Sequence, residues 1–220
     1  MKAEIVANKN FRFDREKLAK YIKVSKDSFM YERLDQLCKE AESIGSPKGI
    51  YNISYVEGKG LDYVKVGDVV FKSELFRENI GEINRFFPYI ATSGEELTKW
   101  AEGFDEIIDQ FLADSIAQRA CKIAQDNIFK EIDEKYGVKK TSTMNPGSLP
   151  QWPVNEQKNL FALFAGGEKK IEVELLPSFL MKPVKTVSGI RYESENDFNN
   201  CKLCPRQKCP NRSAKFQGRY

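Results

Sequence analysis

EELTKWAEGFDEIIDQFLADSIAQRACKIAQDNIFKEIDEKY, residues 95–136, is the longest periodic stretch of the sequence. Apolar side chains recur at three- and four-residue intervals from Phe104 to Ile132, which is the spacing of one face of a helix. A straight helix of this length would span about 60 Å, too much for a compact domain. We therefore expect a break near Gly103. Four small residues indicate that another element crosses the helix closely: Ala113, Ala117, Ala120 and Ala124.

Shorter helices and strands surround this stretch. Helical spacing with capping residues, such as Asp27 before and Gly45 after residues 28–44, predicts helices over 14–23, 27–45, 73–80 and 156–166. Alternating and β-branched residues predict strands over 49–56, 63–71, 170–177 and 184–194, an extended segment over 85–94, and a turn at 57–60. Because helices and strands do not alternate strictly, the pattern favours an α+β single domain: a twisted, mostly antiparallel sheet flanked by helices, one of them long.

Composition excludes several classes of function. The chain has 220 residues, 41% of them hydrophobic and 30% charged, which is typical of a soluble globular protein. No apolar run approaches a signal peptide or membrane span, so we expect a cytoplasmic protein. The absence of histidine removes Ser-His-Asp and Cys-His catalysis and His-ligated zinc. Any chemistry is then expected to belong to a cofactor or a partner.

The net charge of +3 is unevenly distributed. The last twenty residues contain six basic residues and no acid, and we expect them to form a solvated tail, 201–220. No recognisable nucleic-acid-binding module accompanies them, so a nucleic-acid partner is not supported. The basic residues are Lys202, Arg206, Lys208, Arg212, Lys215 and Arg219.

Three cysteines of the tail share a metal-like spacing. Cys201, Cys204 and Cys209 form C-x₂-C-x₄-C, in which three thiolates can hold an iron–sulfur cluster with an open position, or zinc with an outside ligand. A disulfide or redox pair and an unliganded, reduced tail are the alternatives. Cys38 and Cys121 lie on apolar helical stripes, where core cysteines are common.

Residues 142–157, STMNPGSLPQWPVNEQ, indicate a shaped loop. Asn145-Pro146-Gly147-Ser148 is a turn, and its glycine lets backbone N–H groups approach a ligand without a Cβ in the way. Trp152 offers a flat face for stacking an adenine. The alternative is a structural loop anchored by a buried tryptophan. Further hydroxyl groups come from Ser142 and Thr143.

The order of four motifs resembles the activation domain of cobalamin-dependent methionine synthase, in its free-standing subunit form. The motifs are FFPYIATSGEELTKWAEGF (86–104), FLADSIAQRACKIAQDNI (111–128), MNPGSLPQWPVNEQKNLFALF (144–164) and SFLMKPVKTVSGIRY (178–192). The resemblance is strongest over 45–195, and we take 1–200 as the activation-domain-like unit.

The resemblance implies a component of a methyltransferase system in methionine biosynthesis. Such a domain binds S-adenosylmethionine in a shallow groove and supports reductive methylation of cob(II)alamin. The partners implied are a methionine synthase that lacks this domain and carries the cobalamin, and flavodoxin or a similar electron donor. No catalytic side chain is required. The residues implied to line the groove are Thr143, Asn145, Pro146, Gly147, Ser148, Trp152, Ser188, Gly189 and Tyr192.

The chain departs from the family pattern at the site. Thr143 stands where the family has an arginine expected to pair with the ligand carboxylate, and Ser148 where it has a tyrosine. Gln118 or Lys122 falls where a ligand-facing glutamate is expected. Two other functions follow: an iron–sulfur corrinoid-protein activator that uses the tail cysteines, and a docking scaffold that has lost methyl-donor binding.

Overall fold

The periodic stretch 95–136 folds as two helices in the computed structural model, which describes residues 3–195, 198–206, 208–209 and 212–218. Helix α4 (Glu95–Glu102) ends at Gly103, and α5 (Ile107–Tyr136) continues for 30 residues until Gly137, whose φ of +65° ends it. The expected break near Gly103 is therefore confirmed.

A six-stranded sheet forms the centre of the fold, and all its pairings are antiparallel. Its order is β1-β2-β7-β11-β8, with β3 also paired to β7. The predicted strand 49–56 is divided into β2 and β3, and β8 occupies the start of the stretch expected as a loop. The α+β class with an antiparallel sheet is confirmed. The bounds are β1 (Glu4–Ala7), β2 (Lys48–Tyr51), β3 (Ser54–Tyr55), β7 (Arg85–Thr92), β8 (Thr141–Met144) and β11 (Thr186–Glu193).

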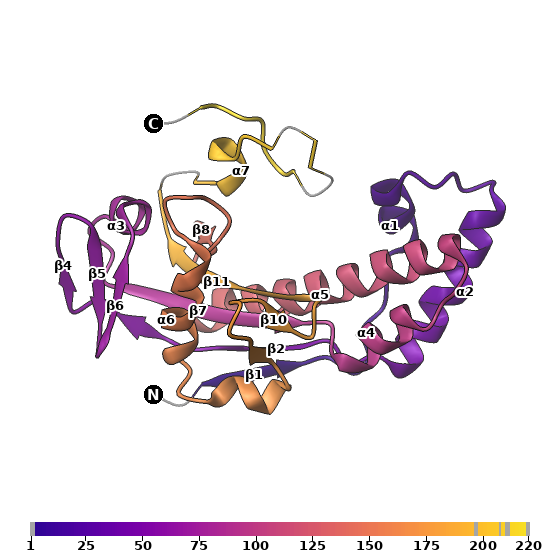
Figure 1. The fold of residues 1–220 in the computed structure, drawn as a ribbon, viewed down its shortest axis with the longest axis horizontal. Helices are drawn as coiled ribbons and strands as arrows, with labels where there is room; N and C mark the ends of the chain where they lie inside the picture. The colour runs from indigo at the N-terminus through magenta and orange to yellow at the C-terminus, as the bar shows by residue number, and fades with distance from the viewer. Residues whose placement is uncertain (1–2, 196–197, 207, 210–211, 219–220) are drawn as a thin grey trace.

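The C-terminal half of α5 covers one face of this sheet (Figure 1). Ala124, Ile128 and Ile132 are buried there against strand residues such as Tyr89. The contact is close at Gly49 of β2, where an added Cβ would lie 2.3 Å from the Ile128 side chain. Small residues on both elements therefore let the helix lie directly on the sheet, as the alanines predict.

The N-terminal half of α5 belongs to a second, helical core. It packs with α1 (Arg15–Ile22), α2 (Phe29–Ile44) and α4 at the end of the molecule away from the small sheet formed by residues 58–72 (Figure 1). Helix α2 begins after Ser28, one residue later than the predicted cap Asp27. The predicted apolar stripe is partly wrong, because Ile107 is 82% and Phe111 47% exposed.

The other face of the sheet carries short elements and a small sheet. Strands β4, β5 and β6 form an antiparallel sheet beside α3, with Gly67 at φ +57° in the turn between β5 and β6. Residues 57–60 were expected as a turn, but β4 forms within them. The predicted strand 170–177 is confirmed only at β9 (Glu174–Leu175), and its start is wrong because residues 167–171 wind into a 3-10 helix that buries Ile171. The bounds are β4 (Gly58–Lys59), β5 (Tyr63–Val66), β6 (Val69–Lys72), α3 (Glu74–Ile80), η1 (Val154–Glu156), α6 (Gln157–Ala162), η2 (Gly167–Ile171), β9 (Glu174–Leu175) and β10 (Met181–Lys182).

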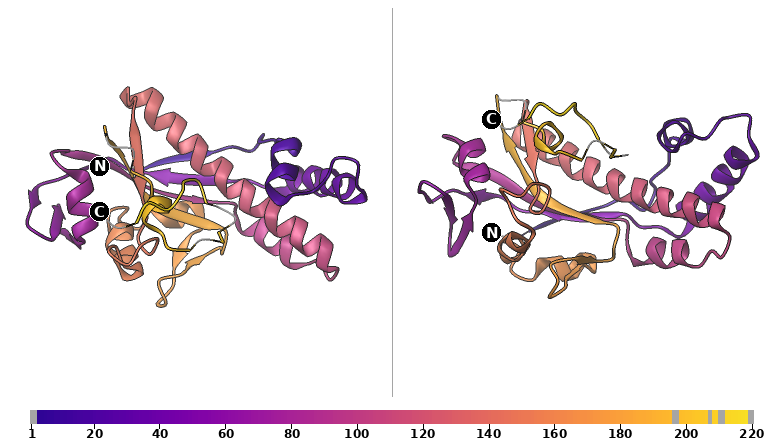
Figure 2. Two further views of the ribbon diagram at one scale, coloured as in Figure 1. Left: turned by 90° about the horizontal axis from the view of Figure 1, so that it is seen from above. Right: turned by 45° about the horizontal axis from the view of Figure 1, so that its top comes forward.

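Where the structure describes it, the tail is exposed or partly exposed to solvent, as expected, but it also carries a short helix and packs against the body of the molecule. Helix α7 (Asn200–Leu203) lies over β8 and β11, as both views in Figure 2 show. Phe198 is buried in the same cluster as Trp152, and the Gln217 N–H donates to the Lys202 carbonyl at 2.8 Å. Among the described residues, no helix has the length and apolar character needed to cross a membrane.

Candidate functional site

The predicted loop residues do not expose their backbone amides. Gly147 has a φ of +83°, and its N–H donates to the Trp152 carbonyl at 2.7 Å. The Ser148 N–H donates to the Asn145 carbonyl at 3.2 Å. Both donors close the loop on itself, so the expectation that these two amides face a ligand is wrong.

Trp152 is an anchor of the core. Its side chain is fully buried and stacks on Phe76 with ring centroids 5.0 Å apart, and its edge meets Phe71. No face of the indole is open to an adenine. The alternative sequence interpretation, a structural loop anchored by a buried tryptophan, describes this side chain correctly.

The residues of the predicted groove lie on two opposite faces of the sheet. Ser188 and Tyr192 are buried on the face away from α5, where the Ser188 hydroxyl donates to Gln157 Oε1 at 2.7 Å. Gly189 lies on the α5 face, because successive strand residues alternate in direction. An added Cβ at Gly189 would lie 2.4 Å from Asn145 Nδ2 and 2.9 Å from the Tyr89 hydroxyl. The predicted groove therefore combined side chains that lie on opposite faces of the sheet.

Asn145 organises the α5 face. Its Nδ2 donates to the Tyr89 hydroxyl at 2.9 Å and to the Ser188 carbonyl at 2.6 Å, and its Oδ1 accepts from Asn200 Nδ2 at 3.1 Å. Gln125 of α5 also donates to the Tyr89 hydroxyl, at 2.9 Å. We call these five residues the Asn145 network. It ties β7, β11, α5 and the tail to the loop that follows β8.

The Tyr89 hydroxyl stays protonated in this network. Burial raises the pKa of Tyr89 to about 12, although the hydrogen bonds from Asn145 and Gln125 act in the opposite direction. The phenol is therefore neutral near pH 7. It supplies a fixed polar group under the loop and is not a candidate base.

Two cations lie beside the Asn145 network on the same face. The ring of Phe129 meets that of Tyr89 edge-on at 5.0 Å, and the guanidinium carbon of Arg191 lies 4.3 Å from the Phe129 centroid. Lys122 Nζ is 5.8 Å from that centroid and pairs with Asp126. Arg191 was not among the predicted residues. Its signal in the sequence was a charged residue within a predicted strand, between the apolar Ile190 and Tyr192.

An ion pair with Asp133 fixes the guanidinium of Arg191. Its Nε and Nη2 donate to Asp133 of α5 at distances between 2.7 and 3.1 Å, and its side chain is 12% exposed. In the register of β11 and β8, Arg191 is the direct partner of Thr143. Side chains at such paired positions lie on the same face of a sheet. Thr143 therefore faces the guanidinium from the neighbouring strand.

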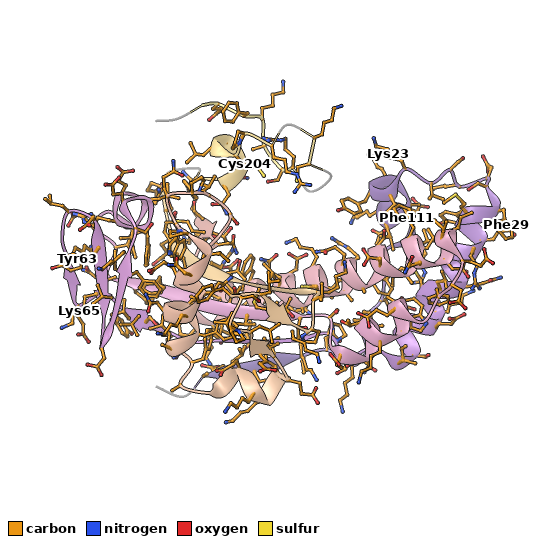
Figure 3. The ribbon with its side chains drawn as sticks, in the orientation of Figure 1. Lys23, Phe29, Tyr63, Lys65, Phe111 and Cys204 are labelled. Carbon is orange, nitrogen blue, oxygen red and sulfur yellow. The ribbon has the colours of Figure 1, made fainter. Side chains whose placement is uncertain are left out.

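The tail cysteines do not converge. Among the described residues, no three His, Cys, Asp or Glu side chains are grouped as metal ligands would be. Cys201 Sγ instead accepts from the N–H and hydroxyl of Ser213, each at 3.5 Å. Burial raises the pKa of the Cys201 thiol, but these hydrogen bonds outweigh it and the pKa lies below its usual value. Cys204, labelled in Figure 3, lies on the side of the molecule that faces away from β1. Iron–sulfur or zinc binding stays a prediction.

Arg212 shapes the loop that carries these cysteines. Its guanidinium donates to the carbonyls of Cys201 and Ala214 through Nη1, and to those of Cys204 and Arg206 through Nη2, at 2.6–3.0 Å. One charged side chain thus satisfies four backbone acceptors. Cys38 and Cys121 are buried in the core as predicted, and burial raises the pKa of each thiol to about 12.

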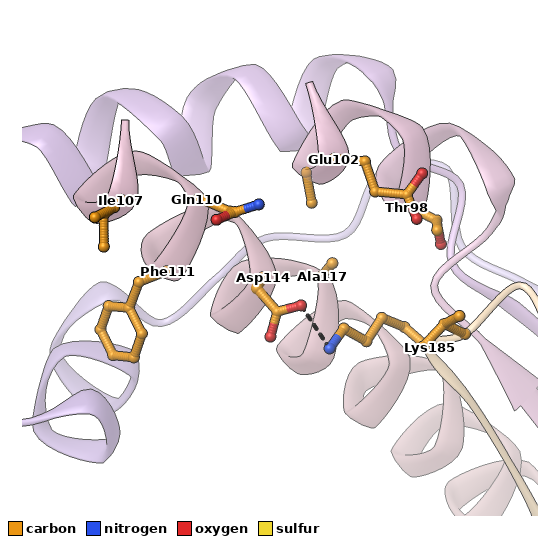
Figure 4. Close-up of a pocket in the computed structure, with 10 residues that line it drawn as sticks. Thr98, Glu102, Ile107, Gln110, Phe111, Asp114, Ala117 and Lys185 are labelled. Carbon is orange, nitrogen blue, oxygen red and sulfur yellow. Dashed lines mark ion pairs between the residues drawn. The ribbon is translucent and has the colours of Figure 1, made fainter. Parts of the chain in front are cut away.

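A hollow of about 390 Å³ lies at the junction of α4, α5 and the segment before β11 (Figure 4). Lys185 and Asp114 form an ion pair across it at 2.7 Å, and Ile107, Phe111 and Val184 contribute apolar walls. Lys185 and Arg191 thus tie the two ends of β11 to α5 through acidic partners. None of the predicted site residues lines this hollow.

The comparisons with known proteins define the fold. No protein-family model matches the sequence, and no curated protein matches it. Among solved structures the chain is similar in fold to the MetH reactivation domain bound to AdoHcy, at 14% sequence identity and a TM-score of 0.63, covering 90% of this chain and 81% of that chain. At this identity the likeness establishes the fold, as the sequence resemblance predicts.

Proposed function

We propose that this chain binds S-adenosylmethionine and acts as the activation subunit of a cobalamin-dependent methionine synthase that lacks its own activation domain. The fold supports this proposal, since it matches over most of the chain a domain whose structure holds AdoHcy, the demethylated form of that donor. The observation that carries it is the α5 face beside the loop. There the Asn145 network, Phe129 and two cations meet.

The groups on this face fit the ligand in part. Adenosine needs polar partners and an apolar surface. The half-buried Phe129 supplies apolar surface, and Asn145 Oδ1 can accept one more hydrogen bond beside that from Asn200, whereas both Nδ2 hydrogens are already used. The amino-acid end needs charged partners, and Lys122 and Arg191 flank the same ring. Trp152 and Tyr192 do not contribute, because both are buried in the core on the other face.

The chemistry asked of this chain is binding and positioning. When bound, the donor would supply the methyl group for a corrinoid that the partner carries and that a flavodoxin or a similar donor would keep reduced. The residues of the α5 face hold the donor in one orientation and keep water from it, which lowers the entropic barrier without a side-chain base. This division of labour agrees with a sequence that has no histidine.

The test is calorimetric titration of the full chain with S-adenosylmethionine and with S-adenosylhomocysteine, alone and with the cobalamin-loaded partner. We expect saturable 1:1 binding in at least one setting. We also expect methylcobalamin to form on the partner when a reductant is added, followed by its visible spectrum. Heat signals that do not saturate in either setting would contradict the proposal.

A docking scaffold without donor binding is the second candidate. It is favoured by the internal hydrogen bonds of Gly147, Ser148 and Asn145 and by the tail that bonds to the loop. Such a scaffold would bind the partner in a pull-down but take up no donor. The iron–sulfur activator has no geometric support among the described residues. Metal analysis of protein purified without air tests it independently.

A further inference from the structure

We infer that Arg191 is the residue that binds the carboxylate of the ligand on the α5 face, in place of any residue at position 143. The inference rests on the proposed function, because it assigns one contact of the proposed donor. Thr143 on β8 and Arg191 on β11 are direct antiparallel partners, so their Cβ atoms lie about 4.5–5.5 Å apart on one face.

The surroundings of Arg191 hold its guanidinium in one orientation. Asp133 accepts from Nε and Nη2, and the Phe129 ring lies under the guanidinium plane at 4.3 Å. Among the described residues, Nη1 donates to no protein group. A planar cation fixed on an aromatic ring, with one amino group left over, pays little entropy on binding a carboxylate.

The neighbouring charges favour Arg191 over the other cation of this face. Lys122 reaches the same ring, but it lies farther from the centroid, 45% of its side chain is exposed, and it pairs with Asp126 one helical turn away. Arg191 pairs with Asp133 and is 12% exposed. A charge-assisted hydrogen bond is stronger where water is excluded. Arg191 is therefore the primary contact, and Lys122 contributes long-range attraction.

The position of Arg191 connects it to the loop. Tyr89 bonds to Asn145 through its hydroxyl and touches Phe129 with its ring, and Phe129 touches Arg191. Tyr89 is fully buried, so a ligand that contacts Asn145 at one end reaches Arg191 across the half-buried ring of Phe129. This arrangement fits a molecule with an adenosine at one end and a carboxylate at the other.

The experiment compares two ligands on matched variants. S-adenosylhomocysteine carries the carboxylate, whereas 5′-methylthioadenosine lacks the amino-acid end. We expect Arg191→Met to weaken S-adenosylhomocysteine binding roughly 10- to 100-fold, the effect of losing a hydrogen bond to a charged group. Binding of 5′-methylthioadenosine should change less than about twofold. Arg191→Lys, which keeps the charge, should retain an intermediate affinity and covers the case in which Arg191→Met does not fold.

Asp133→Asn is the control for a purely structural role. It breaks the same ion pair but leaves the cation, so we expect S-adenosylhomocysteine affinity to be equal to or higher than wild type. Equal losses in Asp133→Asn and Arg191→Met, or equal losses for the two ligands, would overturn the inference. If the wild-type chain and Arg191→Met bind S-adenosylhomocysteine equally well, the assignment of Arg191 is overturned, while the proposed function stands. Failure of the wild-type chain to bind either ligand removes the proposed function together with it.

Discussion

Gly189→Ala is the substitution that most directly probes the α5 face. Gly189 sits in β11 with Tyr89 as its direct partner on β7. A Cβ at this position would lie 2.4 Å from Asn145 Nδ2, 2.5 Å from the Met144 carbonyl oxygen and 2.9 Å from the Tyr89 hydroxyl. The carbonyl oxygen belongs to the backbone of β8 and cannot move without disturbing its pairing with β11.

The expected cost can be built from these contacts. Overpacking a well-packed site costs about 1–3 kcal/mol. Displacing the Asn145 amide removes its bonds to Tyr89 and Ser188, worth about 0.5–1.5 kcal/mol each. Alanine restricts the unfolded chain more than glycine does, which stabilises the folded state by about 0.4–1 kcal/mol. These terms together give a range of about 1–6 kcal/mol, so we expect the free energy of unfolding to fall by about 3 kcal/mol, which lowers the melting temperature by about 6–12 °C.

Urea unfolding followed by far-ultraviolet circular dichroism measures this change. Gly58→Ala is the matched control, because Gly58 also lies in a strand, yet its added Cβ would meet only the Lys65 Cβ at an ordinary 3.7 Å. We expect Gly58→Ala to change stability by less than about 1 kcal/mol. A Gly189→Ala protein whose stability lies within about 0.5 kcal/mol of wild type would show that the loop does not pack on β11 as described.

Three further outcomes follow from the structure. Trp152→Phe should lower the free energy of unfolding by about 1–2 kcal/mol while S-adenosylhomocysteine affinity stays within about twofold of wild type, because the indole is buried and its N–H has no partner among the described residues; a large loss of affinity in titration would contradict this. Ser213→Ala should slow iodoacetamide alkylation of Cys201 at pH 8, since it removes a hydroxyl that stabilises the thiolate; an unchanged rate by mass spectrometry would count against it. Burial raises the pKa of Glu42, but hydrogen bonds, led by the one from Arg15, outweigh it and lower that pKa below its usual 4.5. The stability that this pair contributes is therefore present above pH 4.5 and is lost as the pH falls through the folded pKa. Glu42→Gln should therefore reduce the acid sensitivity measured by urea unfolding between pH 5 and 3, and an unaltered pH profile would refute the assignment.

Helices were predictable where apolar residues recur on one face over several turns. The stripe from Leu112 to Ile132 and the break at Gly103 are local properties, and the structure confirms both. The strand predicted over 170–177 is confirmed only at Glu174–Leu175, because Ile171 is buried at the end of a 3-10 helix and Val173 is buried just after it. Periodicity over so few residues does not distinguish a strand from a 3-10 helix.

The site was less predictable, because its members come from distant segments. Trp152 is buried by Phe76, which precedes it by more than seventy residues, and sequence order carries no sign of that contact. The pairing of Thr143 with Arg191 depends on the register of β8 and β11, which is decided by the core face of each strand. A shift of one residue would place Arg191 in the apolar cluster on the other side. The sequence therefore indicated a shaped loop, but it did not indicate which residues of other segments contact that loop.

Helix α5 contributes to two of the hydrophobic cores, the helical one and the one on its own face of the sheet, and this has a consequence for cooperativity. It is about 45 Å long, and its first half is buried among α1, α2 and α4, while its second half is buried on the sheet. The two cores cannot separate unless the hydrogen bonds in the middle of one continuous helix break. Unfolding of either core therefore withdraws the support of the other, and the chain should behave as a single thermodynamic unit despite its elongated shape (Figure 1).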